Sequence, residues 1–181
     1  MMKHWLFVLL IGFAPLLWSE SESKKDQTSY KVSRRLKVID YYLPALDLKG
    51  KAYRGKETFR ERCAFCHKAT HRGHAFGPNI STLKEKGKVY IMTNMIDPNL
   101  LVLPGYEAHE IETTNELLRG IVTKRTAELL TLKLPLGQIQ RIPPDEIIRI
   151  KALEKSMMPE NLDSGLSHQD MADLLEYLMT Q

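Results

Sequence analysis

The sequence predicts a mainly α fold that carries a small antiparallel β insertion. Residues 54–62, RGKETFRER, have helical character and contain no β-branched run. Residues 167–181 repeat apolar side chains at helical spacing. Between these segments, residues 106–147 contain short strand-type runs separated by turn residues. Two helical ends around a β-rich middle therefore define the expected fold.

Length and composition are those of one soluble domain. The chain has 181 residues, of which 43% are hydrophobic and 27% charged. Its formal net charge of +4 is modest and suits weak docking onto an acidic partner. Residues 24–37 hold six basic groups against one acid, which in an exported chain favours a solvated linker over nucleic-acid binding.

The N-terminus resembles an export signal. Lys3 precedes an apolar run from Trp5 to Trp18, and small residues follow, with a cleavage point expected near Ser21. The run is shorter than the about 20 residues that a membrane span needs. We therefore predict a signal peptide over residues 1–21 and a periplasmic or otherwise exported chain without stable membrane insertion. An uncleaved anchor is the alternative.

The predicted domains follow from these features. Residues 22–37 form the basic linker, and residues 38–181 form the domain, with the β-rich insertion at about 106–147. The expected strands are residues 109–113, 117–123, 129–134 and 138–142.

The two helical ends are expected to pack together. Ser167 is a predicted N-cap and Asp170 completes a capping box for the last helix. In the first helix, Gly55 lies where another helix could approach closely. We predict that the first and last helices cross.

Both cysteines of the chain, Cys63 and Cys66, lie in the segment CAFCH, and His67 follows directly. A disulfide is one interpretation, because exported chains form them. A zinc site formed by these cysteines with His71 and His74 is a second. The third is the C-x-x-C-H attachment site of c-type haem, which alone assigns a role to His67.

The haem interpretation has a physical basis. On one helical turn, Cys63 and Cys66 point the same way, so each could bond one vinyl group of the porphyrin. His67 would then lie under the iron as its proximal ligand. The sequence therefore favours one covalently attached haem c.

The sixth ligand of the iron is expected in KSMMPENL, residues 155–162. Met158 precedes Pro159, which favours extended backbone suited to a loop over a haem face. Met157 would then project to the opposite side. Both methionines as core filler is the alternative.

Taken together, these segments resemble one family, the haem-binding, cytochrome c-like domain of the Planctomycete (Pirellula/Verrucomicrobium) type. The likeness runs from about Val38 to Leu178. It is carried by DYYLPALDLKGKAYRGKETF, CAFCH, GPNIS, IDPN, PGY, SMMPENL and LSHQDMADLLEYL. The segment Asn115-Glu116 departs from it, since the family tends to have Asp-Gly there.

The resemblance implies a cytochrome c-like helical haem domain with His67 and Met158 as axial ligands. Similarity to small cytochromes c further implies that the Pro78 carbonyl accepts a hydrogen bond from His67 Nδ1; a Gly-Pro that merely ends a loop is the alternative. Family members often form the tail of dehydrogenase-like proteins, so the electron donor is expected in a separate chain.

The expected function is single-electron transfer, with no catalytic residue. Redox donor and acceptor proteins would dock transiently, steered by basic groups such as Lys68 and Arg72. A haem enzyme or gas sensor with a displaceable methionine is the alternative, and His109 or His168 would be its acid–base group. A module in which haem only stabilises the fold is a third possibility.

Overall fold

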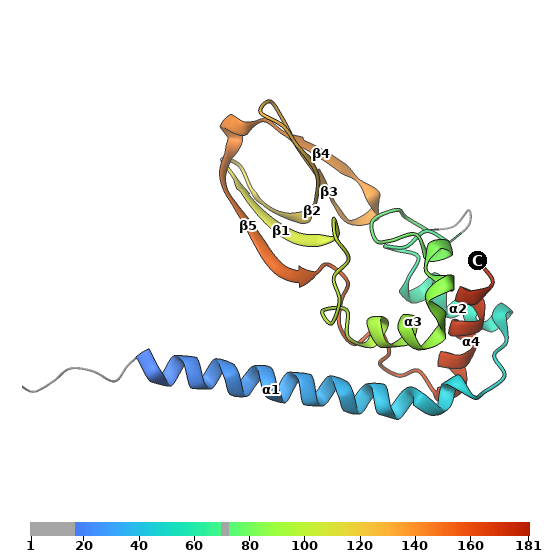
Figure 1. Ribbon diagram of the computed structural model, residues 1–181. Coiled ribbons are helices and arrows are strands. Elements are labelled where there is room, and N and C mark those ends of the chain that lie inside the picture. The colour runs from blue at the N-terminus through green and yellow to red at the C-terminus, as the bar shows by residue number, and fades with distance from the viewer. Residues whose placement is uncertain (1–16, 70–72) are drawn as a thin grey trace, which may run out of the picture. The chain divides into compact units, whose positions relative to one another are not determined.

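The computed structural model describes residues 17–69 and 73–181 and divides the chain into two units, residues 1–37 and 38–181 (Figure 1). The boundary coincides with the predicted start of the domain. Most of the predicted signal peptide, residues 1–16, lies outside the described residues. In the described part of the chain, no helix is both long enough and apolar enough to span a membrane.

The segment expected to be a basic linker is helical. Helix α1 runs from Leu17 to Tyr42 and so includes residues 22–37. Its sequence is rich in Lys, Arg, Glu and Ser and contains neither glycine nor proline, which leaves the helix uninterrupted. A charged, solvated segment and a helix are thus compatible here.

Three further helices, α2 (Ala52–Arg62), α3 (Gly87–Ile96) and α4 (His168–Met179), build the helical part of residues 38–181. The shared core contains Phe59, Met92, Met171, Leu174 and Leu175. Short 3-10 helices accompany these elements at Leu43–Leu46, Ile80–Thr82, Lys84–Lys86, Pro135–Gly137 and Pro144–Glu146.

The predicted crossing of the first and last domain helices is confirmed. Gly55 of α2 is buried against α4, and a Cβ there would collide with the Asp173 carbonyl oxygen and lie 2.8 Å from Leu174 Cα. Asp173 itself is 1% exposed and accepts a 2.7 Å hydrogen bond from the Lys51 backbone N–H at the start of α2. One buried carboxylate thereby ties the start of α2 to the middle of α4.

The predicted start of α4 is also confirmed. The Ser167 hydroxyl oxygen accepts from the Asp170 N–H at 3.1 Å, and the Asp170 carboxylate accepts from the Ser167 N–H at 3.0 Å. This reciprocal pair satisfies amide groups that a helix otherwise leaves without partners.

The β region is a five-stranded antiparallel sheet in the order β4-β3-β2-β1-β5. The strands are β1 (Glu107–Thr113), β2 (Leu117–Arg125), β3 (Leu130–Lys133), β4 (Ile139–Ile142) and β5 (Ile147–Ser156). The first four correspond to the predicted strands. The chain enters the sheet from α3 through β1 and leaves it towards α4 through the neighbouring β5 (Figure 1).

The predicted fold class is wrong. The chain is not a mainly α, cytochrome c-like helical domain with a small insertion, because the sheet reaches Ser156 and has its own core. That core consists of Ile111, Leu118, Leu130, Leu132 and Ile142. The missing strand was β5, which carries charged side chains and has no buried residue. It lacks the apolar alternation that marks a half-buried strand.

Candidate functional site

The cysteine segment forms a tight turn at the end of α2. Cys63 is the C-cap of that helix, and its carbonyl accepts from the N–H groups of Cys66 at 3.0 Å and His67 at 2.8 Å. The two cysteines therefore lie one helical turn apart, as the haem interpretation requires. Both thiols are free.

The environment of both thiols disfavours the thiolate form. Burial raises the pKa of the Cys63 thiol to about 12, and burial also raises the pKa of Cys66. Nucleophilic catalysis uses the thiolate, which burial of these two side chains disfavours.

His67 is held in one orientation. Its side chain is 9% exposed, and Nδ1 lies 2.9 Å from the Pro78 carbonyl oxygen. Because a carbonyl can only accept, Nδ1 carries the hydrogen and Nε2 keeps its lone pair. Burial lowers the pKa of His67, and the bond to Pro78 opposes that shift without reversing it. A neutral imidazole with a basic Nε2 is what a metal ligand requires, and the predicted Pro78 contact is confirmed.

Phe76 and Gly77 lie beside the cysteine turn, and Gly77 directly precedes Pro78, the hydrogen-bond partner of His67. The Cys66 carbonyl accepts from the N–H groups of Phe76 at 3.0 Å and Gly77 at 2.7 Å. A Cβ on Gly77 would lie 2.6 Å from His67 Cε1, inside any normal contact distance. Glycine at this position is therefore what lets the imidazole lie against the backbone.

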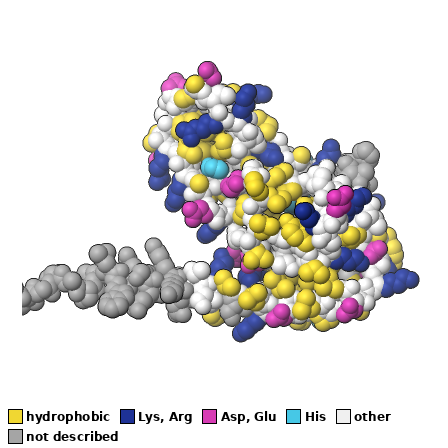
Figure 2. Space-filling view, viewed as in Figure 1, with side chains coloured by type: hydrophobic (Ala, Val, Ile, Leu, Met, Phe, Trp, Pro, Cys, Tyr) yellow, Lys and Arg dark blue, Asp and Glu magenta, His cyan; other side chains and the backbone are white. Residues whose placement is uncertain are grey.

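The predicted site residues meet at one apolar cavity in residues 38–181. It contains about 980 Å³ of space not occupied by atoms, part of which opens to solvent. Cys63, Cys66 and His67 line it together with Met157 and Met158. Its other lining residues include Phe59, Phe76, Ile80, Leu83, Ile91, Leu101 and Leu178. Figure 2 shows hydrophobic side chains gathered over the helical part of this unit.

The methionine pair does not behave as expected. Residues 157 and 158 form a bend, not extended backbone, and both side chains line the cavity. The prediction that Met157 projects away from the site is therefore wrong. Met158 additionally packs against the helical core. A third methionine, Met95 on α3, also lines the cavity.

Two of the candidate histidines from the sequence, His109 and His168, lie elsewhere. His109 on β1 contacts the Glu107 carbonyl through Nδ1 at 3.0 Å, and His168 stacks on Tyr41 with 4.5 Å between ring centroids. Neither lines the cavity. His71 and Arg72 fall outside the described residues. Within residues 17–69 and 73–181, no three His, Cys, Asp or Glu side chains are placed to share a metal ion.

Several lining residues were not predicted. The sheet contributes Ile121 and Ser156, and the loop before β1 contributes Tyr106, over whose ring Lys133 Nζ lies at 5.3 Å. Asn94 on α3 also lines the cavity, and its Oδ1 is buried without a hydrogen-bond partner. These residues come from α3, the loop before β1 and two strands, and only their long-range packing brings them to one cavity.

Comparison with known proteins adds no family. No protein-family model matches the chain, and no curated protein matches it.

Proposed function

We propose that this protein is an exported electron carrier that binds one haem c covalently and passes single electrons between redox partners. One observation carries the proposal: Cys63, Cys66 and His67 line the same apolar cavity as Met157 and Met158. The histidine and Met158 are 91 positions apart in the sequence. Covalent haem attachment with histidine and methionine ligands explains this convergence better than a disulfide or a zinc site.

The chain's own residues fit such a group. The thiols of Cys63 and Cys66, one turn apart, would hold it to the cavity wall, and His67 would offer Nε2 to the metal while Pro78 fixes its other nitrogen. The apolar lining excludes water from the group. When bound, an iron porphyrin supplies reversible one-electron chemistry.

The methionine segment offers a thioether ligand at the same cavity. We assign this role to Met158, which packs against the helical core and would be the second protein ligand of the metal. Methionine paired with histidine raises the reduction potential of haem iron, which suits electron transfer. A peroxidase-like enzyme needs an acid–base group beside the metal, and neither His109 nor His168 lines the cavity. A carrier is therefore the better-supported function.

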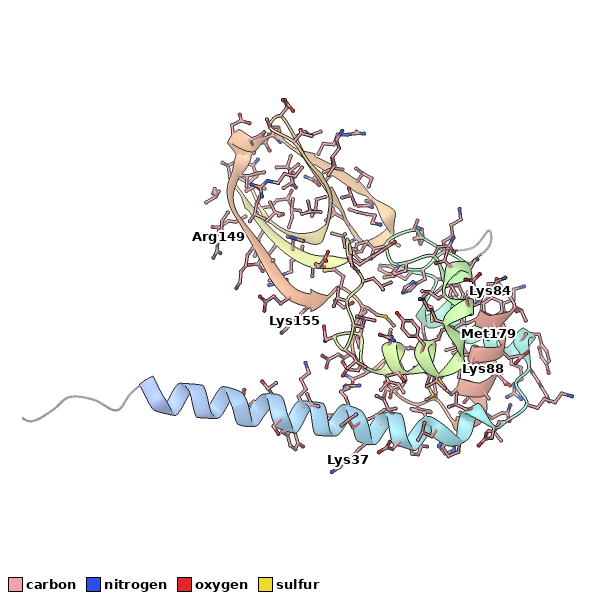
Figure 3. The ribbon with its side chains drawn as sticks, in the orientation of Figure 1. Lys37, Lys84, Lys88, Arg149, Lys155 and Met179 are labelled. Carbon is pink, nitrogen blue, oxygen red and sulfur yellow. The ribbon has the colours of Figure 1, made fainter. Side chains whose placement is uncertain are left out.

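Partners would dock at the cavity edge nearest the cysteines. Phe65, between the two cysteines, is 55% exposed, and Lys68 is also exposed. Lys84, adjacent to the lining residue Leu83, is a second exposed cation, and Figure 3 shows Lys84 and Lys88 on the helical part. An apolar contact beside basic groups suits brief docking of an acidic redox protein.

The test is a redox titration followed by optical spectroscopy of protein matured in a bacterial host that attaches c-type haem. We expect a low-spin ferric spectrum with the methionine–iron charge-transfer band in the red, and full reversibility over one electron. A high-spin ferric form that binds cyanide or carbon monoxide readily would instead support the enzyme or sensor. Covalent haem that no reductant reduces reversibly would leave only a structural role.

A further inference from the structure

Asn99 is a polar side chain that the function proposed above does not use. It lies in the turn that follows α3, where the Asp97 carboxylate accepts from its N–H at 3.3 Å. The Asp97 carbonyl accepts from the next N–H, that of Leu100, at 3.1 Å. Asp97 thus holds the turn that carries Asn99.

The Asn99 amide group contacts both ends of the methionine segment. Its Oδ1 accepts from the Ser156 N–H at 3.0 Å, and its Nδ2 donates to Glu160 Oε1 at 2.8 Å. Ser156 and Glu160 are separated in sequence only by Met157, Met158 and Pro159. One side chain therefore bridges the segment that carries both candidate thioethers.

The segment between these two bonds has few ways to move. The Ser156 hydroxyl accepts from the Met158 N–H at 3.0 Å, and Pro159 restricts the backbone conformation of Met158. On the preceding side, the register between β1 and β5 shifts, because Glu107 pairs with Ser156 but His109 pairs with Ala152. Regular strand pairing is therefore interrupted just before the methionines.

We propose that Asn99 is the positioning residue that holds the Met158 thioether over the cavity. The inference rests on the proposed function, because it assigns Asn99 a role toward a methionine-ligated group. Asparagine suits the position since it offers an acceptor and a donor on one rigid planar group. Without this bridge, ordering the segment would cost more conformational entropy each time the thioether binds.

The structure separates the two halves of the bridge experimentally. Asn99→Ala removes both bonds. Asn99→Asp keeps an acceptor for the Ser156 N–H but sets a carboxylate against Glu160. Asn99→Asp combined with Glu160→Gln restores a donor–acceptor pair with reversed direction, since the glutamine amide can donate to the new carboxylate. This double variant is the rescue.

The experiment measures haem content by intact mass, the methionine–iron band in the ferric spectrum, and the reduction potential at neutral pH. We expect Asn99→Ala and Asn99→Asp to retain haem, lose most of the band and show a lower potential. The double variant should recover most of the band and potential. Ser167→Ala, which weakens α4 away from this loop, serves as the control for general destabilisation and should keep the band.

The outcomes distinguish failure of the Asn99 positioning role from failure of the proposed haem ligation. If the wild-type protein carries haem and shows the band, but both Asn99 single variants keep it, the positioning role is overturned while the electron-carrier proposal stands. An equal loss of the band in Ser167→Ala, or no recovery in the double variant, also overturns it. If the wild-type protein has no haem or no methionine band, the proposed ligation fails and the role of Asn99 fails with it.

Discussion

At the scale of single residues, the site depends on how the backbone fixes one imidazole. The Pro78 carbonyl oxygen is 2.9 Å from His67 Nδ1, and Gly77 leaves room for the ring. Both groups act on the same side chain from consecutive positions. The orientation of the His67 imidazole is therefore set by Gly77 and Pro78, which lie beside the cysteine turn.

Gly77→Ala tests this arrangement. The new methyl group would lie 2.6 Å from His67 Cε1, so the ring or the returning chain must move. We expect haem to stay covalently attached through the cysteines, with weakened histidine ligation and a growing high-spin fraction in the optical spectrum. An unchanged low-spin spectrum would show that the ring tolerates the displacement. Gly165→Ala, outside the cavity lining and with no atom within 4 Å of the new Cβ, provides the glycine control.

The two methionines need a direct comparison, because both line the cavity. We expect Met158→Ala to retain haem but to lower the reduction potential markedly, since axial ligands set it over a range of about 0.8 V. Met157→Ala should change the potential little. If the two variants behave in the opposite way, the ligand is Met157, one position earlier in the chain. Met95→Ala extends the comparison to the third thioether.

At the scale of elements, the frame of the site is the contact between α2 and α4. Gly55 and the buried carboxylate of Asp173 bring the two helices together, and α2 delivers the cysteine turn. The sheet also contributes to the site, because β5 ends at Ser156 directly before the methionines and Ile121 of β2 lines the cavity. Residues of the helical part and of the sheet thus line one cavity.

Gly55→Ala tests the helix crossing. Its Cβ would collide with the Asp173 carbonyl oxygen, and backbone on both sides leaves no flexible atom to yield. Overpacking of this kind costs about 1–3 kcal/mol of unfolding free energy. Chemical denaturation of the haem-bound protein measures it, and a cost near zero would contradict the close approach. Gly105→Ala, where a Cβ meets nothing within 4 Å, controls for the loss of glycine itself, although its φ of +81° adds some strain.

The capping box of α4 predicts a pH dependence of stability. Hydrogen bonds from the Ser167 side chain and backbone hold the pKa of the Asp170 carboxyl below its ordinary value. A depressed folded-state pKa stabilises the protein above the unfolded-state pKa of about 3.9, and this contribution disappears as pH falls through the folded-state value. We expect wild type to exceed Asp170→Asn in unfolding free energy at neutral pH, with the difference shrinking on acidification. A constant difference down to the lowest measurable pH would contradict this.

At the scale of the whole molecule, local features were predictable and long-range ones were not. The spacing of Cys63, Cys66 and His67 fixed the turn geometry, and Ser167 with Asp170 marked the start of α4, because each feature depends on neighbours within a few residues. The haem interpretation predicted that the cysteine and methionine segments belong to one site, and residues of both segments line the same cavity; the haem itself stays a prediction.

The errors concern elements whose state is decided by tertiary contacts. Strand β5 has exposed charges such as Lys151 and Lys155, and it is a strand because β1 pairs with it. Helix α1 is a different case, because its charge pattern indicated a solvated segment while its lack of glycine and proline is compatible with a helix. The side chain of Asn99 bonds Ser156 and Glu160, which follow it by 57 and 61 positions in the sequence. No local pattern therefore indicates this bridge.

Intact mass measurement tests the central claim most directly, with protein matured in a bacterial host that attaches c-type haem. The account predicts a polypeptide heavier by one haem that survives denaturation. The Cys63→Ser and Cys66→Ser double variant should carry none, because it lacks both thiols on the cavity wall. A wild-type chain with the mass of the bare polypeptide, from a host shown to mature another cytochrome c in parallel, would contradict the account.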